Sequence, residues 1–379
     1  MKYGMLWAKN TRNIGDDIQS YAQLLFLPKL DYFVEREEIS NFKSKNNEPV
    51  AVIMNAWWMW KKFNWPPAKC IIPKLISMHF TEWTTENWGT PIKHEIFEGL
   101  GRDYLNSYGP VGCRDLNTLE ILKNYKIDAY FSGCVTLTLP KQKKKKLKKE
   151  YVCAVDVKDN VINKIKSSIN DKMDLKIMTH DLTEENEKLS LEQRKNNVIK
   201  VLTTYQNAKC VITSRLHVAL PCLAMEVPVL LVRDGNDWDR FSPYIDLLNF
   251  MTPDEFCEGK YDIFKPLENK KDYLEIRNNL ISSIKEFIEE TSKMSNNLDD
   301  IVKTKYTDEE VKNWQYDLMK DALYSWFDRS RGMLAEYNKT IDYLRKVEKE
   351  VDDLKNSTSW KITKPIRSIK GKVDSLFKK

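Results

Sequence analysis

The sequence predicts an α/β fold in which two domains, each built on a doubly wound parallel sheet, precede a helical C-terminal extension. Short apolar runs typical of buried strands recur through residues 1–232, and longer amphipathic segments separate them. This alternation favours parallel sheets flanked by helices. A lysine block at 141–150 interrupts the alternation and indicates a domain boundary. From Leu334 onward, apolar residues recur at spacings of three and four, as in a long helix.

The 379 residues carry a formal net charge of +6, and the basic excess is concentrated in two places. Seven lysines lie between Lys141 and Lys149, and the C-terminal end is rich in lysine and arginine. The remainder is close to neutral. This distribution argues against a nucleic-acid-binding face over the whole protein, so we expect no nucleic-acid partner.

Seven cysteines are scattered along the chain without a C-x-x-C pair, and several lie inside apolar runs. This pattern predicts buried free thiols in a reducing compartment, and neither a zinc site nor a disulfide framework. No signal peptide is visible, and the longest apolar run, 218–232, is too short to cross a bilayer. We therefore expect a cytoplasmic protein. Peripheral contact with the inner face of the membrane is a further possibility.

The first domain is expected to cover residues 1–140. Each apolar run in it is followed by a polar turn and a helical segment, as in a βα unit. Strands are expected at 3–8, 50–55, 75–79, 109–113 and 129–131, with helices beginning near Ile18, over 97–107 and over 117–123.

The loop before the first expected helix carries Asn13, Gly15, Asp16 and Asp17. Gly15 allows a close turn, and Asp16 or Asp17 is expected to cap the helix. One glycine is too few for the G-x-G-x-x-G fingerprint of a dinucleotide site. Two interpretations stay open at this point, a ligand-binding entry and a capped helix without a ligand.

Two tryptophans, Trp57 and Trp58, follow directly after the expected strand at 50–55. Aromatic side chains at strand ends stack on sugar rings or bases, and they also fill protein cores. The spacing alone leaves both possibilities open.

The lysine block at 141–150 is expected to be a solvated linker, with contact to nucleic acid or anionic lipid as the alternative. The second domain is then expected to cover 151–293. Its alternation of short strands and helices repeats that of the first domain. Strands are expected at 151–157, 174–179, 210–212 and 227–232, with helices over 160–169, 190–206, 218–225 and 271–293.

The strand at 210–212 leads into Ser214, Arg215 and His217, and a helix follows at once. Ligands of parallel α/β sheets bind beyond the carboxyl ends of the strands, and helix N-termini attract anions. An arginine and a histidine at this place predict an anion site with a proton-transfer group. Arg114 occupies an equivalent strand-to-helix junction in the first domain. The alternative is a histidine that merely bonds to the helix turn.

The extension at 294–379 is expected to contain a long amphipathic helix or coiled coil over 334–354. A basic tail that contains Trp360 follows it. Such a tail suits an anionic membrane surface or a partner helix. Self-association through the helix and the tail is therefore one expectation.

Three motifs in this order resemble the polysaccharide pyruvyl transferase family: N-I-G-D-D-I-Q-S-Y-A at 13–22, G-x-R-D at 112–115 and S-R-L-H at 214–217. The resemblance covers roughly residues 1–260. The tail S-T-S-W-K-I-T-K-P-I-R looks like a C-terminal element of polysaccharide-assembly glycosyltransferases. The resemblance implies two Rossmann-like domains that face each other across a cleft, as in GT-B glycosyltransferases. It also implies transfer of the pyruvyl group of phosphoenolpyruvate onto a sugar of a surface polysaccharide, as a ketal.

The resemblance also implies roles for individual residues. It makes His217 the catalytic residue, and phosphoenolpyruvate is then a co-substrate in a reaction without cofactor or metal. Arg114, Ser214, Arg215 and Leu216 become the donor-binding residues. The acceptor would be a glycan or a lipid-linked oligosaccharide, and the candidates for binding it are Asn13, Asp16, Asp17, Trp57 and Trp58.

Two other functions remain open from the sequence. A basic strand-end turn suits a nucleotide diphosphate as well as phosphoenolpyruvate, so a nucleotide-sugar glycosyltransferase of the same fold is the first alternative. A non-catalytic scaffold for glycan assembly, which would use the C-terminal helix, is the second.

Overall fold

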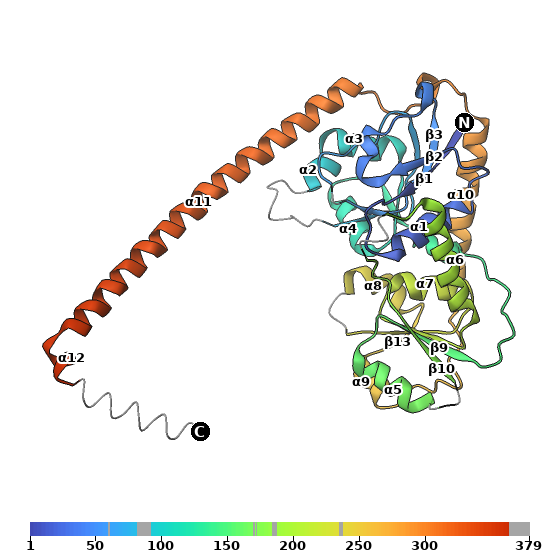
Figure 1. The fold of residues 1–379 in the computed structure, drawn as a ribbon. Coiled ribbons are helices and arrows are strands. Elements are labelled where there is room, and N and C mark those ends of the chain that lie inside the picture. The colour runs from blue at the N-terminus through green and yellow to red at the C-terminus, as the bar shows by residue number, and fades with distance from the viewer. Residues whose placement is uncertain are drawn as a thin grey trace. The chain divides into compact units, whose positions relative to one another are not determined.

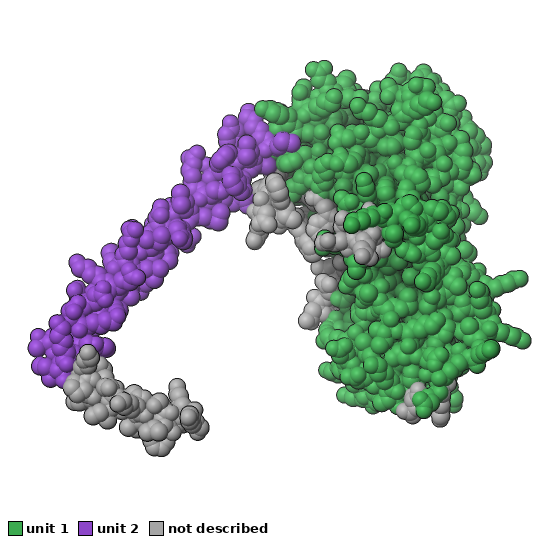
Figure 2. Space-filling view, in the orientation of Figure 1, with its two compact units in different colours: residues 1–84, 91–318 green, residues 85–90, 319–379 purple. Residues whose placement is uncertain are grey.

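The computed structural model describes residues 1–59, 61–81, 92–169, 171, 173–183, 188–234 and 238–363, without the side chains of residues 92 and 238–240. It forms two compact units, shown in green and purple in Figure 2. The first contains residues 1–84 and 91–318, and the second contains 85–90 and 319–379. Both sheets lie in the first unit, and the basic tail from 364 onward lies outside the described residues.

The first sheet has four parallel strands in the order β2-β1-β3-β5. Its strands are β1 (Lys2–Trp7), β2 (Tyr32–Glu35), β3 (Val50–Ile53) and β5 (Ile71–Lys74). Two short parallel pairs follow, of β4 (Trp57–Trp58) with β6 (His79–Phe80) and of β7 (Val111–Cys113) with β8 (Ala129–Phe131). The single strand expected at 75–79 is therefore wrong, because β5 ends at Lys74 and β6 begins at His79.

The second sheet has five parallel strands in the order β10-β9-β11-β12-β13. They are β9 (Tyr151–Val155), β10 (Asp174–Met178), β11 (Val211–Thr213), β12 (Val229–Val232) and β13 (Asn249–Met251). Every residue of β9, β11 and β12 is buried. Burial on both faces explains why these strands read as continuous apolar runs, and the predicted α/β class with parallel sheets is confirmed.

Helices connect and cover the strands (Figure 1). The α-helices of the first unit are α1 (Ile14–Leu24), α2 (Ile92–Ile96), α3 (Gly99–Tyr108), α4 (Leu116–Asn124), α5 (Asp159–Ile169), α6 (Leu191–Asn207), α7 (Leu216–Ala224), α8 (Trp238–Ile245), α9 (Pro253–Cys257) and α10 (Tyr273–Lys293). Short 3₁₀ turns are η1 (Arg36–Asn41), η2 (Lys45–Asn47), η4 (Val135–Thr138) and η6 (Leu298–Asp300).

A long helix, α11 (Asp308–Asn356), begins in the first unit and provides most of the second, followed by α12 (Thr358–Ile362). The sequence predicts its apolar pattern only from Leu334. The structure extends the helix to 49 residues, so the helical C-terminal region is confirmed and is longer than expected.

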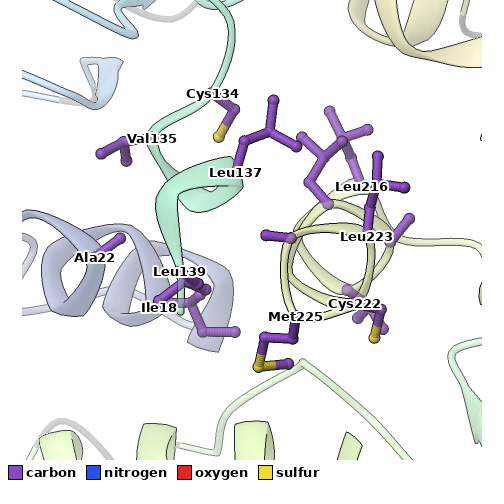
Figure 3. Packing of buried hydrophobic residues seen from close by; sticks show 14 of the residues in the cluster. Ile18, Ala22, Cys134, Val135, Leu137, Leu139, Leu216, Cys222, Leu223 and Met225 are labelled. Carbon is purple, nitrogen blue, oxygen red and sulfur yellow. The ribbon is translucent and has the colours of Figure 1, made fainter. Parts of the chain in front are cut away.

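One apolar core is shared by the two sheets. It contains Tyr3 and Ile53 from the first sheet together with Cys153 and Val211 from the second. The turn η4 lies between α1 and α7 in this core, as Figure 3 shows. Because both sheets bury side chains in the same cluster, α1 and α7 are held firmly where the carboxyl ends of the strands meet.

The lysine block at 141–150 has no regular secondary structure, and its side chains are mostly exposed. Its backbone is nevertheless fixed to the end of α6. The amide of Gln142 donates to Gln206 Oε1 at 2.8 Å, and the amide of Lys145 donates to Asn207 Oδ1. The predicted domain limits at 140 and 151 stay a prediction.

All seven cysteines are free, and six of them are buried, which agrees with the sequence-based expectation. Within the part of the chain that the structure describes, no group of histidine, cysteine and acidic residues is arranged to hold a metal ion. Across the same residues, no helix is long and apolar enough to cross a membrane.

Candidate active site

The loop that carries Asn13 is bound to the segment that follows β10. Asn13 caps α1 by accepting a hydrogen bond from the Gly15 amide at 2.8 Å, so the expected capping by Asp16 or Asp17 is wrong. The Ile14 amide donates to the His180 carbonyl at 3.0 Å, and Asn13 forms an isolated antiparallel bridge with Asp181. The first loop of the first sheet is therefore held at a strand end of the second.

Gly15 lies against the His217 ring. A Cβ atom placed on Gly15 would lie 2.7 Å from His217 Nδ1, closer than such contacts occur, and 3.0 Å from the His217 Cβ. Only a glycine leaves room for the imidazole at this place. His217 is the second residue of α7 and is 8% exposed. The contact joins two of the three motifs that the sequence singles out.

Asp156, directly after β9, organises the strand ends around Arg215. Its backbone has a φ of 51°, in the left-handed region. One carboxylate oxygen accepts from Arg215 Nε at 3.0 Å and from the His180 amide at 2.9 Å. The Ser214 hydroxyl donates to the Asp156 carbonyl.

The guanidinium of Arg215 also donates to Asp181 Oδ1 at 2.7 Å. The Arg215 side chain is 35% exposed and that of Asp181 is 68% exposed. A solvent-exposed ion pair of this kind contributes about 1 kcal/mol or less. Displacing Asp181 from Arg215 therefore costs an anion with two or more charges little free energy. The contact with the less exposed Asp156 keeps the Arg215 side chain in place.

His180 is a buried neutral base beside this arginine. Burial lowers the pKa of His180 to about 4; the Asp156 carboxylate opposes this shift, and the charge of Arg215 adds to it. Its Nε2 lies 2.7 Å from the Tyr205 hydroxyl of α6. An imidazole that stays neutral at pH 7 does not add to the positive charge of the site, so His180 supports the loop and Arg215 supplies the charge.

Arg114 is buried at 2% exposure, at the junction of β7 and α4. Its Nη1 donates to Gln19 Oε1 at 3.3 Å, and its Nε lies 3.9 Å from Asp115 Oδ2. Asp115 caps α4, as expected, through the Thr118 amide at 2.9 Å. Burial opposes ionisation of Asp115, but its hydrogen bond with His79 and the neighbouring positive charges outweigh this and lower its pKa.

One face of α1 connects the two arginine neighbourhoods. Gly15 contacts His217, and Gln19 accepts from Arg114. These α1 residues are four apart, which places them on the same face with a rise of about 6 Å. The structure therefore brings Arg114 and His217 to neighbouring turns of a single helix.

The acceptor candidates fall into different surroundings. Asp16 accepts from the Thr11 hydroxyl within its own loop. Asp17 is buried in an ion pair with Arg194 of α6, and Arg194 also donates to the backbone of Ala8 and Lys9. Burial raises the pKa of Asp17, and Arg194 opposes this rise.

The two tryptophans separate as well. Trp58 is fully buried, with its ring centroid 5.3 Å from that of Trp65. Trp57 is partly exposed, and the guanidinium of Arg36 lies 5.7 Å from its ring centroid. Trp58 thus belongs to the aromatic core, and only Trp57 retains an accessible surface.

A groove of about 480 Å³ runs along α1 and α6. It combines aromatic side chains with acidic and basic ones, as carbohydrate sites do. Its lining includes Trp7, Asp17, Tyr21, Phe33, Glu192 and Lys195.

Comparison with known proteins adds the family. Residues 13–236, more than half of the chain, match the family model for polysaccharide pyruvyl transferase. The chain belongs to the polysaccharide pyruvyl transferase family. The match covers all three motifs, and it ends before α8. This family membership makes the chain a transferase of the kind that acts on polysaccharides.

Solved structures resemble the chain only distantly. A variant of the wall teichoic acid polymerase TagF is 12% identical, with 86% of this chain and 90% of that chain covered and a TM-score of 0.34. A structure of accessory secretory proteins 1, 2 and 3 from Streptococcus pneumoniae is 10% identical, with 81% and 58% covered and a TM-score of 0.32. No curated protein matches the sequence. At these TM-scores neither structure bears on function.

Several residues at the site are not found by sequence reasoning. Asp156 leaves a weak signal, since it is a polar residue directly after the apolar strand β9. His180 lies two residues beyond β10, which has no continuous apolar run, and leaves none. Gln19 and Arg194 lie in ordinary helical patterns and leave none. Their contacts join residues 95 and 177 positions apart, which no local pattern shows.

Proposed function

We propose that this family member transfers the pyruvyl group of phosphoenolpyruvate onto a sugar of a surface polysaccharide and forms a ketal, in a cleft between its two halves. The contact of Gly15 with His217 is the observation that carries the proposal. It sets an imidazole where strand ends of both sheets meet, next to Arg215 and one helical turn from the partner of Arg114.

The donor carries a carboxylate and a phosphate, and arginine binds each of these groups through two parallel N–H bonds. In the proposal Arg215 takes one group after the exposed Asp181 moves away. Ser214 and Leu216 contribute at the start of α7, where helix N–H groups favour an anion. Arg114 lies deeper and orients the donor through Gln19.

The reaction balances with these groups alone. A proton adds to the methylene carbon of phosphoenolpyruvate, which becomes the methyl group. A sugar hydroxyl attacks the neighbouring carbon and gives its proton back to the group that supplied the first one. The bond between that carbon and the phosphate oxygen then breaks. A second hydroxyl of the same sugar attacks, and its proton leaves with the phosphate. In the proposal His217 supplies the proton to the methylene carbon as general acid.

The groove along α1 and α6 is lined by Asp17 and Tyr21, on the face of α1 opposite Gly15 and Gln19. It is therefore our candidate for binding acceptor sugars beyond the one that reacts. Phe33 is 44% exposed at its rim, on the edge strand β2. An aromatic ring of this kind stacks on the apolar face of a sugar, and Asp17 and Glu192 accept hydrogen bonds from hydroxyls. Phe33→Ala should raise KM for the acceptor several-fold and leave KM for phosphoenolpyruvate unchanged. Phe264→Ala, at a residue exposed to 38% outside the groove, is the control.

The decisive experiment incubates the purified protein and a surface-glycan acceptor with phosphoenolpyruvate or with a panel of nucleotide sugars. The proposal expects phosphate release that depends on the acceptor, and a product heavier by one pyruvate less one water. Nucleotide release without phosphate release from phosphoenolpyruvate would support the glycosyltransferase alternative and reject the proposal.

A cell-based comparison addresses the scaffold alternative. Arg215→Ala and His217→Ala should remove ketal groups from the surface glycan while the protein level stays normal. Full ketal content in these variants would mean that the chain supports ketal formation as a scaffold and does not catalyse it.

A further inference from the structure

The second unit carries a seven-residue repeat that the proposed function does not use. Eleven positions of α11, from Met319 to Leu354, alternate at spacings of four and three. Nine of these are apolar, and the two others are hydroxyl residues. The full series is Met319, Leu323, Trp326, Ser330, Met333, Tyr337, Thr340, Leu344, Val347, Val351 and Leu354.

Most of these apolar side chains are exposed in the single chain. Eight of the nine are between 41% and 64% exposed. Flanking residues widen the same stripe, with Phe327 at 47% and Leu334 at 60%. Contiguous apolar surface of this extent on a monomer indicates an interaction site.

The repeat length specifies the kind of partner. A straight α-helix drifts by about 20° per heptad relative to a 3.5-residue repeat, so over five heptads the stripe turns by roughly 100°. A flat membrane surface or a rigid protein face would lose contact with such a stripe. A second helix with the same repeat follows it by supercoiling to the left, and each apolar side chain then enters a hole between four partner residues.

The hydroxyl positions restrict the registers in which a second copy can pair. In a parallel pair in register, Ser330 faces Ser330 and Thr340 faces Thr340, so each buried hydroxyl meets a hydrogen-bond partner. An antiparallel pair keeps at most ten of the eleven layers. If Leu323 faces Leu354, Ser330 would face Val347 and Thr340 would face Tyr337. If Met319 faces Val351 instead, Ser330 would face Thr340. A buried Ser330 hydroxyl opposite an apolar side chain loses its hydrogen bonds to water. Thr340 keeps the hydrogen bond that its hydroxyl donates to the Glu336 carbonyl of its own helix at 3.1 Å.

The flanking charges agree with the parallel arrangement. In that arrangement Glu350 reaches Lys355 of the other copy, and no like charges meet at the flanking positions. The antiparallel register with Leu323 opposite Leu354 brings Arg329 near Glu350, but it also sets Lys320 against Lys355. The register with Met319 opposite Val351 brings Lys320 near Glu348, but it sets Glu336 against Glu336.

We propose that two copies of this chain associate through a parallel, in-register coiled coil over residues 319–354. The paired segment is roughly 50 Å long at 1.5 Å per residue. The proposal does not depend on the transferase chemistry, because none of the candidate site residues lies in this helix.

Oxidative cross-linking of the full-length chain tests the pairing and its direction. In a background with Cys257→Ser, since Cys257 is the one cysteine that is not buried, Leu323→Cys and Leu354→Cys should each give a covalent dimer. A parallel, in-register coiled coil brings each new cysteine next to the same cysteine of the other chain. Ala335→Cys, on the opposite face, is the matched control and should stay largely uncross-linked.

The outcomes separate clearly. A cross-link that forms only when the Leu323→Cys and Leu354→Cys proteins are mixed would show an antiparallel pair and overturn the proposal. By sedimentation the unmodified protein should have twice the mass of its 44.7 kDa chain. Leu344→Lys combined with Val351→Lys should give a monomer, and Asp342→Lys on the outer face should not. A monomeric unmodified protein, or a dimer that survives the double substitution, would also overturn the proposal.

Discussion

At the scale of single residues, the site depends on the absence of a side chain at Gly15. Gly15→Ala should push the His217 ring out of position, because the new methyl group would meet Nδ1 at 2.7 Å. We expect kcat for phosphate release to fall by about 100-fold, the effect of misplacing a proton-transfer group. Steady-state kinetics measure this fall.

Gly332→Ala serves as the control for that substitution. A Cβ on Gly332 meets nothing within 4 Å, and the residue lies inside α11. This change should leave kcat unchanged and stabilise the helix slightly. Normal activity of the Gly15→Ala enzyme would remove His217 from the mechanism.

The second residue-scale prediction concerns the two carboxylates on Arg215. Asp181→Asn removes the exposed carboxylate that pairs with Arg215. It should lower KM for phosphoenolpyruvate several-fold, because that carboxylate no longer competes with the donor for the guanidinium. Arg215→Ala should raise KM about 10- to 100-fold, as expected for a charge-assisted hydrogen bond of 1.5–3 kcal/mol. Isothermal titration with phosphoenolpyruvate gives the affinities directly. Equal affinities in both variants and the unmodified protein would place the donor elsewhere.

At the scale of elements, His180 ties the end of β10 to α6 through Tyr205. Burial lowers its pKa to about 4, below the ordinary value of 6.5. The unfolded chain therefore binds the extra proton first as pH falls, and stability is lost between about pH 6.5 and pH 4. This stabilisation is fully present above pH 6.5 and amounts to at most about 3 kcal/mol.

His180→Gln tests this linkage by urea unfolding at pH 7.5 and pH 5. The free energy of unfolding of the unmodified protein should fall more between the two pH values than that of the variant. The difference between the two proteins in this pH dependence gives the contribution of His180 alone, because the other titrating groups are the same in both. An identical pH dependence would mean that the imidazole titrates normally in the folded state.

The sequence predicts the elements around the site better than the contacts within it. Strand-end positions for Arg114 and Arg215 follow from apolar runs and polar turns, which are local patterns. The contact of Gly15 with His217 joins distant segments, and no local pattern encodes it. The surroundings of Trp58 are equally invisible, because a tryptophan after a strand suits a core and a sugar platform alike. The apolar pattern does not show the full extent of α11, because the first turns of that helix mix aromatic and charged residues.

At the scale of the whole first unit, the buried pair of Asp17 and Arg194 joins α1 to α6. Asp17→Asn should destabilise the protein by about 3–5 kcal/mol, because it leaves an arginine buried without its counter-charge. Arg194→Met in the same chain should restore part of that loss. Chemical unfolding of the two single variants and the double variant completes the cycle. Additive effects would mean that the two side chains do not act as a pair.

The shared core has a consequence for protein engineering. Enzymes with separable halves lend themselves to recombination, in which a donor-binding half from one relative is joined to an acceptor-binding half from another. Here Ile18, Leu137 and Leu223 belong to one apolar cluster that both sheets supply. A chimera cut at the lysine block would combine surfaces that evolved against different partners. Useful hybrids would have to carry α1, η4 and α7 together as one inherited block.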